Sequence, residues 1–281
     1  MDFFNKYKNE DQIRKQRIAS MVAYQSALKE VESVIEIYKS ISDLILFTGK
    51  LYMVIVSGRS CILGTELIDS TVMTLKNIKS CLTNGSLSDA YTLLRKVRDE
   101  SLLFLYFLII VRNNHSKKVE INDQIQNLFD WYDSKISYIK NEEVFNYIRK
   151  YQNVDSVISK HDLDSEWEEL RIKLNEYVHT KGVKNASSNY SQIYDYESGF
   201  EEIGEDIKYI AVSFIFILLM IDSTVIMSTD YIDYLEMNMI PPDGSQYEIA
   251  PVVQKFIDTY LKTYNNELVT FIKETSVMNI N

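Results

Sequence analysis

The stretch LNEYVHTKG, residues 174–182, places Asn175 four residues before His179. Residues four apart on an α-helix lie on one face, so this amide and imidazole can meet. An imidazole at a helix end, oriented by a neighbouring amide, is suited to moving protons near neutral pH. The alternative is an ordinary polar flank, because the helix dipole favours histidine near a C-terminus. Both interpretations stay open at this point.

The helical period places a cation and a carboxylate on the same flank of this helix. Arg171 and Glu168 fall on the same side as Asn175 and His179, beside the apolar face. A proton-transfer group and a phosphate-binding cation could therefore share one helix surface. The expected buried stripe of the helix consists of Trp167, Leu170, Leu174, Tyr177 and Val178.

A second polar cluster lies in LLRKVRDESLLF, just before a wholly apolar run. Arg95 and Asp99 are i,i+4 partners, and Arg98 lies near Arg95 on the same face. These charges sit where the helix enters the core, where an unpaired arginine would be costly. The cluster predicts either a structural Arg95–Asp99 salt bridge or an anion site at which Arg98 or Arg95 meets a phosphate.

Several classes of site are excluded by the motifs that the chain lacks. It contains no GxxxxGK[ST], GxGxxG, GxSxG or HExxH. Its 3 histidines and 2 cysteines are not at zinc-ligand spacing, and no ExxH pair indicates a di-iron bundle. We therefore expect no metal site and no cofactor.

The elements that must position these residues are expected to be helices. Only 8 glycines and 3 prolines occur in 281 residues, and the prolines all lie between 241 and 251. So few breakers favour long helices over a β architecture. We predict one all-α, bundle-like domain of about eight helices over 1–281.

The predicted helices begin with one or two long helices in 10–57, divided near Gly49 or Gly58. A helix over 62–82 should end at Asn84–Gly85, and capping boxes at Ser165 and Ser198 should start the two that follow the irregular stretch 115–160. Residues 183–197 are expected to form a loop and 250–275 the last helix. Two segments, 102–111 and 209–227, are strongly apolar; we predict that they are buried core helices and not membrane spans, given Asp222 and the acidic flanks.

Net charge and cysteine content bear on the cellular location and the partners of the protein. The net charge of −10 argues against indiscriminate binding to nucleic acid or anionic lipid, although it permits a local basic site. Cys61 and Cys81 form no CxxC motif, and the first residues are too polar for a signal peptide. The sequence thus predicts a cytoplasmic protein with no membrane partner.

Taken together, the arginine–acid pair that opens an apolar helix (LLRKVRDESLLFLYFL), the glycine-broken helix before it (IKSCLTNGSLSDAY) and the N-x-x-x-H helix end resemble the HEPN-like bacterial proteins. The resemblance covers roughly 65–230. It implies a dimeric helical domain of the toxin–antitoxin and phage-defence type. In active members, an Arg-polar-x-x-x-His motif from each protomer cleaves RNA without metal.

The chain departs from that motif at one position. Asn175 and His179 match its polar residue and its histidine, but Leu174 stands where arginine is expected. Arg171 or Arg98 could take the role of the phosphate partner. The expectation is a metal-independent ribonuclease acting on RNA, and the alternative is a non-catalytic interaction or sensor module that binds a protein partner.

Overall fold

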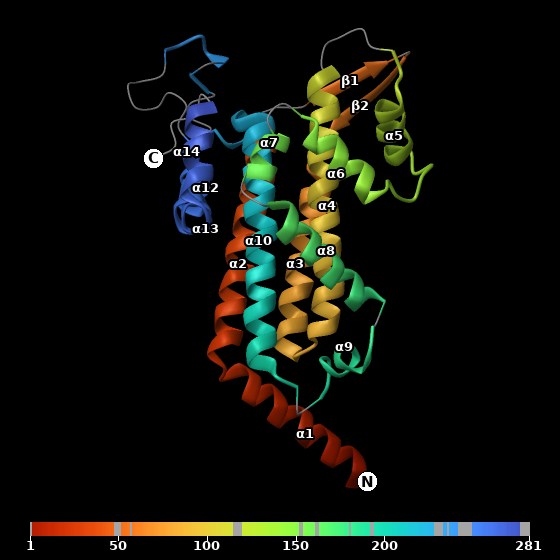
Figure 1. The fold of residues 1–281 in the computed structure, drawn as a ribbon, viewed down its shortest axis with the longest axis vertical. Helices are drawn as coiled ribbons and strands as arrows, with labels where there is room; N and C mark the ends of the chain where they lie inside the picture. Colours follow the sequence, from red (N-terminus) through yellow and green to blue (C-terminus); the bar gives the residue numbers. More distant parts are fainter. Residues whose placement is uncertain are drawn as a thin grey trace. The chain divides into compact units, whose positions relative to one another are not determined.

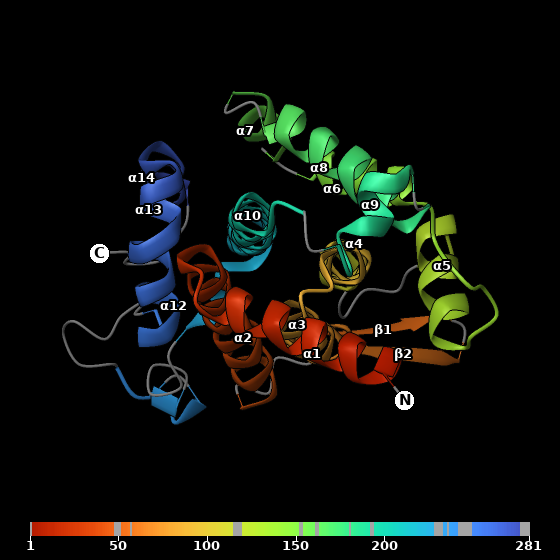
Figure 2. The ribbon, with the colours of Figure 1, turned by 90° about the horizontal axis from the view of Figure 1, so that it is seen from below.

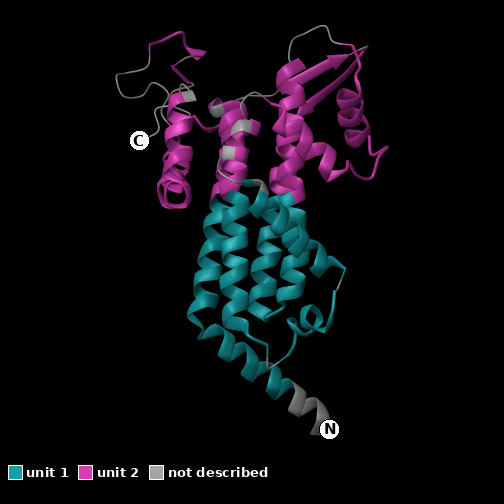
Figure 3. Ribbon diagram, in the orientation of Figure 1, with its two compact units in different colours: residues 1–36, 71–98, 163–211 teal, residues 37–70, 99–162, 212–281 magenta. Residues whose placement is uncertain are grey.

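The computed structural model describes residues 2–47, 52–56, 58–114, 120–151, 154–160, 163–179, 181–191, 194–227, 233–234, 236–240 and 249–275. Most of them are helical, and one small β-hairpin accompanies the helices (Figure 1). The predicted helical class is confirmed. Two compact units are formed: unit 1 comprises 1–36, 71–98 and 163–211, and unit 2 comprises 37–70, 99–162 and 212–281 (Figure 3). The single domain stays a prediction.

Unit 1 is a helical bundle. The four longest helices are α2, α3, α4 and α10, and the parts of them that belong to unit 1 run side by side in both views (Figures 1 and 2). Helix α8 packs on this bundle through Trp167, whose ring lies 6.0 Å from that of Tyr209. The helices that contribute to unit 1 are α1 (Asp2–Ala19), α2 (Val22–Phe47), α3 (Glu66–Asn84), α4 (Leu87–Asn114), α8 (Leu163–Val178), α9 (Val183–Ser187) and α10 (Tyr196–Asp222).

The apolar face of α8 lies where the helical period predicts it. Trp167, Leu170, Leu174 and Tyr177 are buried, and Val178 is half-buried. Burial of such a stripe stabilises a helix more than its intrinsic propensity does. Outside this stripe, Glu168, Glu169 and Arg171 are exposed to solvent.

The stop after α3 is confirmed. The helix ends at Asn84, and Gly85 has φ +69°, in the left-handed region that glycine adopts without a Cβ penalty. A Cβ at this position would also meet Cδ1 of Ile18 at 2.5 Å. Backbone conformation and close packing therefore both require glycine here.

Two predicted helix starts are wrong by a few residues. Helix α8 begins at Leu163, before the expected cap at Ser165, and α10 begins at Tyr196, before Ser198. The Asp195 carboxylate accepts a hydrogen bond from the Ser198 N–H at 3.2 Å, so an aspartate serves as the N-cap in place of the expected serine. Several residues suited to capping lie close together in both segments, and the sequence pattern selects the wrong one.

The stretch 183–197 was expected to be a loop, but it contains the short helix α9. Helix α8 ends at Val178, and Gly182, with φ +88° and ψ 164°, is the N-cap of α9. Five residues are too few for a periodic signal, which is why the pattern favours a loop. This helix forms one wall of the pocket described below.

Unit 2 contains the hairpin, which corrects the helix expected through residue 57. Strands β1 and β2 pair antiparallel with Val54 opposite Cys61, and both of these residues are buried. The segment YMVIV is rich in β-branched residues, which fit a pleated surface better than a helix. The other elements of unit 2, besides its parts of the long helices, are α5 (Asp123–Tyr132), α6 (Asn141–Arg149), α7 (Val154–Lys160), η1 (Ser223–Ile226), α12 (Pro251–Phe256), η2 (Ile257–Leu261), α13 (Lys262–Tyr264) and α14 (Asn266–Thr275), and its strands are β1 (Tyr52–Val56) and β2 (Arg59–Leu63).

The last predicted helix is divided in the structure. A turn of π-helix, η2, follows α12, and the extended residue Asn265 separates α13 from α14. The two apolar segments are buried over 104–111 and 210–219, as their composition predicts. Among the described helices, none combines the length and the apolar character that a membrane crossing requires.

Candidate functional site

His179 lies just beyond the last residue of α8. Its side chain is exposed, and its backbone N–H donates to the Asn175 carbonyl oxygen at 3.1 Å. Asn175 is half-buried one turn earlier. Asn175 and His179 therefore lie at the end of a helix, where the sequence predicted them.

Arg171 is engaged by a neighbour on its own helix. Its Nε and Nη2 donate to the two carboxylate oxygens of Glu168 at 2.6 and 2.5 Å. These hydrogen bonds from Arg171 lower the pKa of Glu168, and the charge of Arg98 contributes to the same shift. Eight residues separate Arg171 from His179, which is about 12 Å along the helix axis. The flank thus carries a local ion pair at one end and the histidine at the other.

Arg98 belongs to the core of unit 1. Its side chain is only 2% exposed, and its charge acts on Glu168. Glu168 lies eleven residues before His179, or about 16 Å along α8. Of the two arginines considered as phosphate partners, Arg171 therefore pairs with Glu168, and the charge of Arg98 acts on the same carboxylate.

Arg95 and Asp99 are both half-buried on α4, one turn apart. The boundary between the two units falls between them, with Arg95 in unit 1 and Asp99 in unit 2. The salt bridge and the anion site proposed for this cluster both stay predictions.

Leu174, at the position where the motif has arginine, points into the core of unit 1. Its side chain is fully buried, at 0% exposure. A leucine suits this position, because this side of α8 packs into the core of unit 1. An arginine here would have to bury its guanidinium group.

The flank of α8 on the side of Tyr177, beside the buried stripe, carries a polar network that the sequence pattern did not predict. The ammonium group of Lys173 lies 2.7 Å from an oxygen of Asp206 and 3.1 Å from an oxygen of Glu202. It also lies 5.0 Å from the ring centroid of Tyr91. One cation thus joins three elements, α8, α10 and α4.

Three tyrosines extend this arrangement, which we call the Lys173 network. The rings of Tyr91 and Tyr177 stack with their centroids 4.1 Å apart and an interplanar angle of 11°. A hydrogen bond joins the hydroxyls of Tyr177 and Tyr194. Burial raises the pKa of Asp206, although Lys173 opposes that shift, and burial raises the pKa of each tyrosine as well. The tyrosines are therefore neutral hydrogen-bonding groups at physiological pH.

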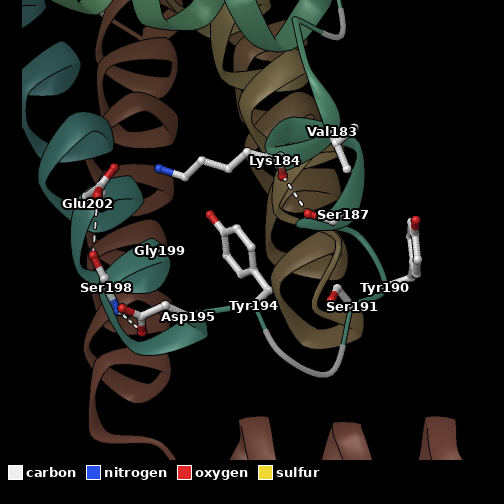
Figure 4. Close-up of a pocket in the computed structure, with 10 residues that line it drawn as sticks. All are labelled: Val183, Lys184, Ser187, Tyr190, Ser191, Tyr194, Asp195, Ser198, Gly199 and Glu202. Carbon is white, nitrogen blue, oxygen red and sulfur yellow. Dashed lines mark hydrogen bonds between the residues drawn. The ribbon is translucent and has the colours of Figure 1, made fainter.

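A pocket of about 570 Å³ adjoins the network between α9 and the start of α10 (Figure 4). Glu202 and Tyr194 belong to both the pocket wall and the network. The pocket is also lined by Lys184 from α9, by Asp195, the N-cap of α10, and by Ser198 from the first turn of α10. Its size is in the range of small-molecule sites.

The segment that connects α9 to α10 is anchored at Asn189. Its side-chain oxygen accepts from the Ser88 N–H at 2.9 Å at the start of α4, and its carbonyl oxygen accepts from Arg14 at 2.8 Å. Side-chain capping of this kind satisfies helix N–H groups that have no partner within the helix. The pocket wall is consequently tied to two bundle helices.

A sequence signal for the network did exist. Lys173 and Tyr177 are i,i+4 partners on α8, and Glu202 and Asp206 are i,i+4 partners on α10. Each pair alone is typical of a solvated helix flank. Their convergence depends on the packing of α8 against α10, which the local pattern does not contain.

Comparison of the chain with protein-family models, with curated protein sequences and with solved structures found no match. Within the described part of the chain, no group of three His, Cys, Asp or Glu side chains converges in a way that could hold a metal ion.

Proposed function

We propose that the chain is a non-catalytic interaction or sensor module of the HEPN-like type, and that unit 1 carries its recognition site. The observation that carries this proposal is the environment of Leu174. In the resembled motif, this position supplies the arginine that steadies the phosphate, but here it is fully buried. The helix face that would present the arginine is used for packing.

The neighbouring residues support the same proposal. Arg171 forms an ion pair with Glu168, and Arg98 lies in the core near the same carboxylate. His179 is left with an amide neighbour and an exposed setting. The pocket beside the Lys173 network, in contrast, offers a formed concave surface with charged and hydroxyl groups, which suits binding. We further propose that the protein acts as a dimer in the cytoplasm, with a protein partner of defence or toxin–antitoxin type.

A second candidate, a metal-independent ribonuclease, is favoured by the exposed His179 with Asn175 one turn before it. In that case the imidazole would transfer the proton of the ribose 2′-hydroxyl or of the leaving oxygen. An arginine from a second copy would then have to supply the positive charge.

Incubation of the purified protein with total RNA, with and without EDTA, decides between the two. The module predicts intact RNA in both conditions, with His179→Ala identical to the wild type. RNA cleavage that persists in EDTA and disappears in His179→Ala would establish the ribonuclease. Cleavage that His179→Ala leaves unchanged would identify a contaminant, so the variant serves as the control for purity.

A further inference from the structure

The pocket between α9 and α10 presents opposite charges on facing walls. Lys184 extends from α9 across the pocket, and Figure 4 shows its ammonium end directed toward Glu202. Lys184 makes no ion pair with any residue that the structure describes. A cation in this position is available to a ligand that carries an acidic group.

The α10 wall is anionic and held in place. The Glu202 carboxylate accepts a hydrogen bond from the Ser198 hydroxyl at 3.3 Å and pairs with Lys173 at 3.1 Å. A carboxylate has about four lone-pair sites, so these contacts leave room for a further donor. Asp195, one side of the same wall, is fixed by the Ser198 N–H. Two positioned carboxylates on this wall would repel a multiply charged anion such as phosphate.

Tyr194 contributes a neutral group to the lining of the pocket. The Tyr194 ring stands beside Lys184 in Figure 4, and its hydroxyl is bonded to Tyr177, which stacks on Tyr91. Burial raises the pKa of Tyr194, so the hydroxyl keeps its proton near neutral pH. It can therefore donate or accept without adding charge.

We propose that this pocket binds a free amino acid or a similarly small zwitterion, with the ligand carboxylate on Lys184 and the ligand ammonium on Glu202. A lone anion would meet the carboxylates of the α10 wall, and a lone cation would meet Lys184. A ligand with both charges satisfies both walls. The volume of about 570 Å³ leaves space for the ligand's own side chain. The assignment rests on the proposed sensor function, for which this ligand is the input.

Calorimetric titration and thermal melting test the assignment with four sets of probes. These are the free amino acids, the matching acids without the amine, the matching amines without the carboxylate, and inorganic phosphate. At least one amino acid is expected to bind saturably and to raise the melting temperature, because a ligand that binds only the folded state stabilises it. The single-charge probes and phosphate should bind at least about tenfold more weakly, a difference of about 1.4 kcal/mol.

Variants locate the binding. Lys184→Ala and Glu202→Gln should each weaken it by at least about tenfold, whereas Lys181→Ala, which removes an exposed cation three residues before Lys184, should leave it unchanged. Since Lys184 is exposed and outside the core, its variant folds even where Glu202→Gln does not. The assignment is overturned by an absence of binding to every amino acid, by equal binding of the single-charge probes, or by full binding in Lys184→Ala. RNA cleavage by the wild type that persists in EDTA and disappears in His179→Ala would overturn the proposed function without changing these binding results.

Discussion

The two flanks of α8 carry similar residue types in different environments. On one flank, Arg171 and Glu168 form an ion pair with side chains 45% and 53% exposed, and His179 follows in solvent. On the other flank, Lys173 is 29% exposed and meets Asp206, which is 20% exposed. Exposed pairs are screened by water and contribute little, whereas a partly buried carboxylate depends on its cation.

The two flanks of α8 differ in the structural environment of their residues more than in residue type. The histidine flank has the residue types of a catalytic site, but its charges neutralise each other locally. The lysine flank has ordinary residue types, but packing gathers them from three helices beside a pocket. We infer that the lysine flank, and not the histidine flank, carries the fixed polar geometry of unit 1.

The largest expected effect follows from restoring the motif. Leu174→Arg would place a guanidinium group at a fully buried position, and we expect it to lower the free energy of unfolding by about 4 kcal/mol or more. Chemical denaturation measures this loss. The matched control is Ile172→Arg, at a position 48% exposed on the same helix, which should change stability by less than about 0.5 kcal/mol. A stable Leu174→Arg protein would show that this face of α8 can open to solvent.

Removal of the central cation should have the next largest effect. Lys173→Met leaves Asp206 partly buried without its partner, so we expect a loss of about 2–3 kcal/mol, below the range for a fully buried pair. Lys181→Met is the control, because its pair with Glu176 is exposed and should contribute less than about 0.5 kcal/mol. Equal losses of stability in Lys173→Met and Lys181→Met would show that the Lys173 network is screened by solvent as strongly as an exposed ion pair.

The pH dependence of stability should report on Asp206. Burial raises its pKa above the ordinary 3.8, so the folded protein holds this proton more tightly than the unfolded chain does. That contribution stabilises the fold below pH 3.8 and is lost as the pH rises through the raised pKa. Because Asp206→Asn has no proton to lose, its stability relative to the wild type should increase with pH across this window.

Denaturation curves of the wild type and Asp206→Asn, recorded from about pH 4 to about pH 7, measure the difference. Glu205→Gln is the neighbouring control, since Glu205 is 70% exposed and pairs only with Lys208 among the described residues. A stability difference that stays flat or falls with rising pH would mean that Lys173 outweighs burial at Asp206.

The smallest effect is expected on the histidine flank. Arg171→Ala removes an exposed i,i+3 ion pair and should cost less than about 0.5 kcal/mol. Thermal melting at low and at high salt checks this, with little difference expected between the variant and the wild type at high salt. A loss comparable to that of Lys173→Met would show that Arg171 has a structural role beyond its exposed pair.

Much of the fold follows from local sequence. The scarcity of glycine and proline predicts helices, the Asn84–Gly85 stop is a conformational requirement of one residue, and the stripe of α8 follows from its period. The hairpin was not predicted because YMVIV lies within 10–57, where the helical pattern predicted one or two long helices divided near Gly49 or Gly58, although its β-branched residues favour a strand. The short helix α9 was not predicted because its five residues are too few to show a helical period.

The candidate site was harder to predict than the fold. The positions of Asn175 and His179 at a helix end follow from spacing alone. The convergence of Lys173, Glu202 and Asp206 does not, since it depends on which flanks of α8 and α10 meet after packing. The buried setting of Leu174 was predictable from the stripe, and it is this setting that weighs against catalysis.

Residue-resolved NMR of the full chain compares the two regions in one measurement. The protein is titrated first with the tightest-binding amino acid and then, separately, with a short single-stranded RNA. The account predicts that the amino acid shifts the backbone resonances of Lys184, Gly199 and Glu202 in the pocket, while RNA leaves those of Asn175 and His179 unmoved. RNA-dependent shifts centred on Asn175 and His179, with the pocket unaffected by any amino acid, would contradict it.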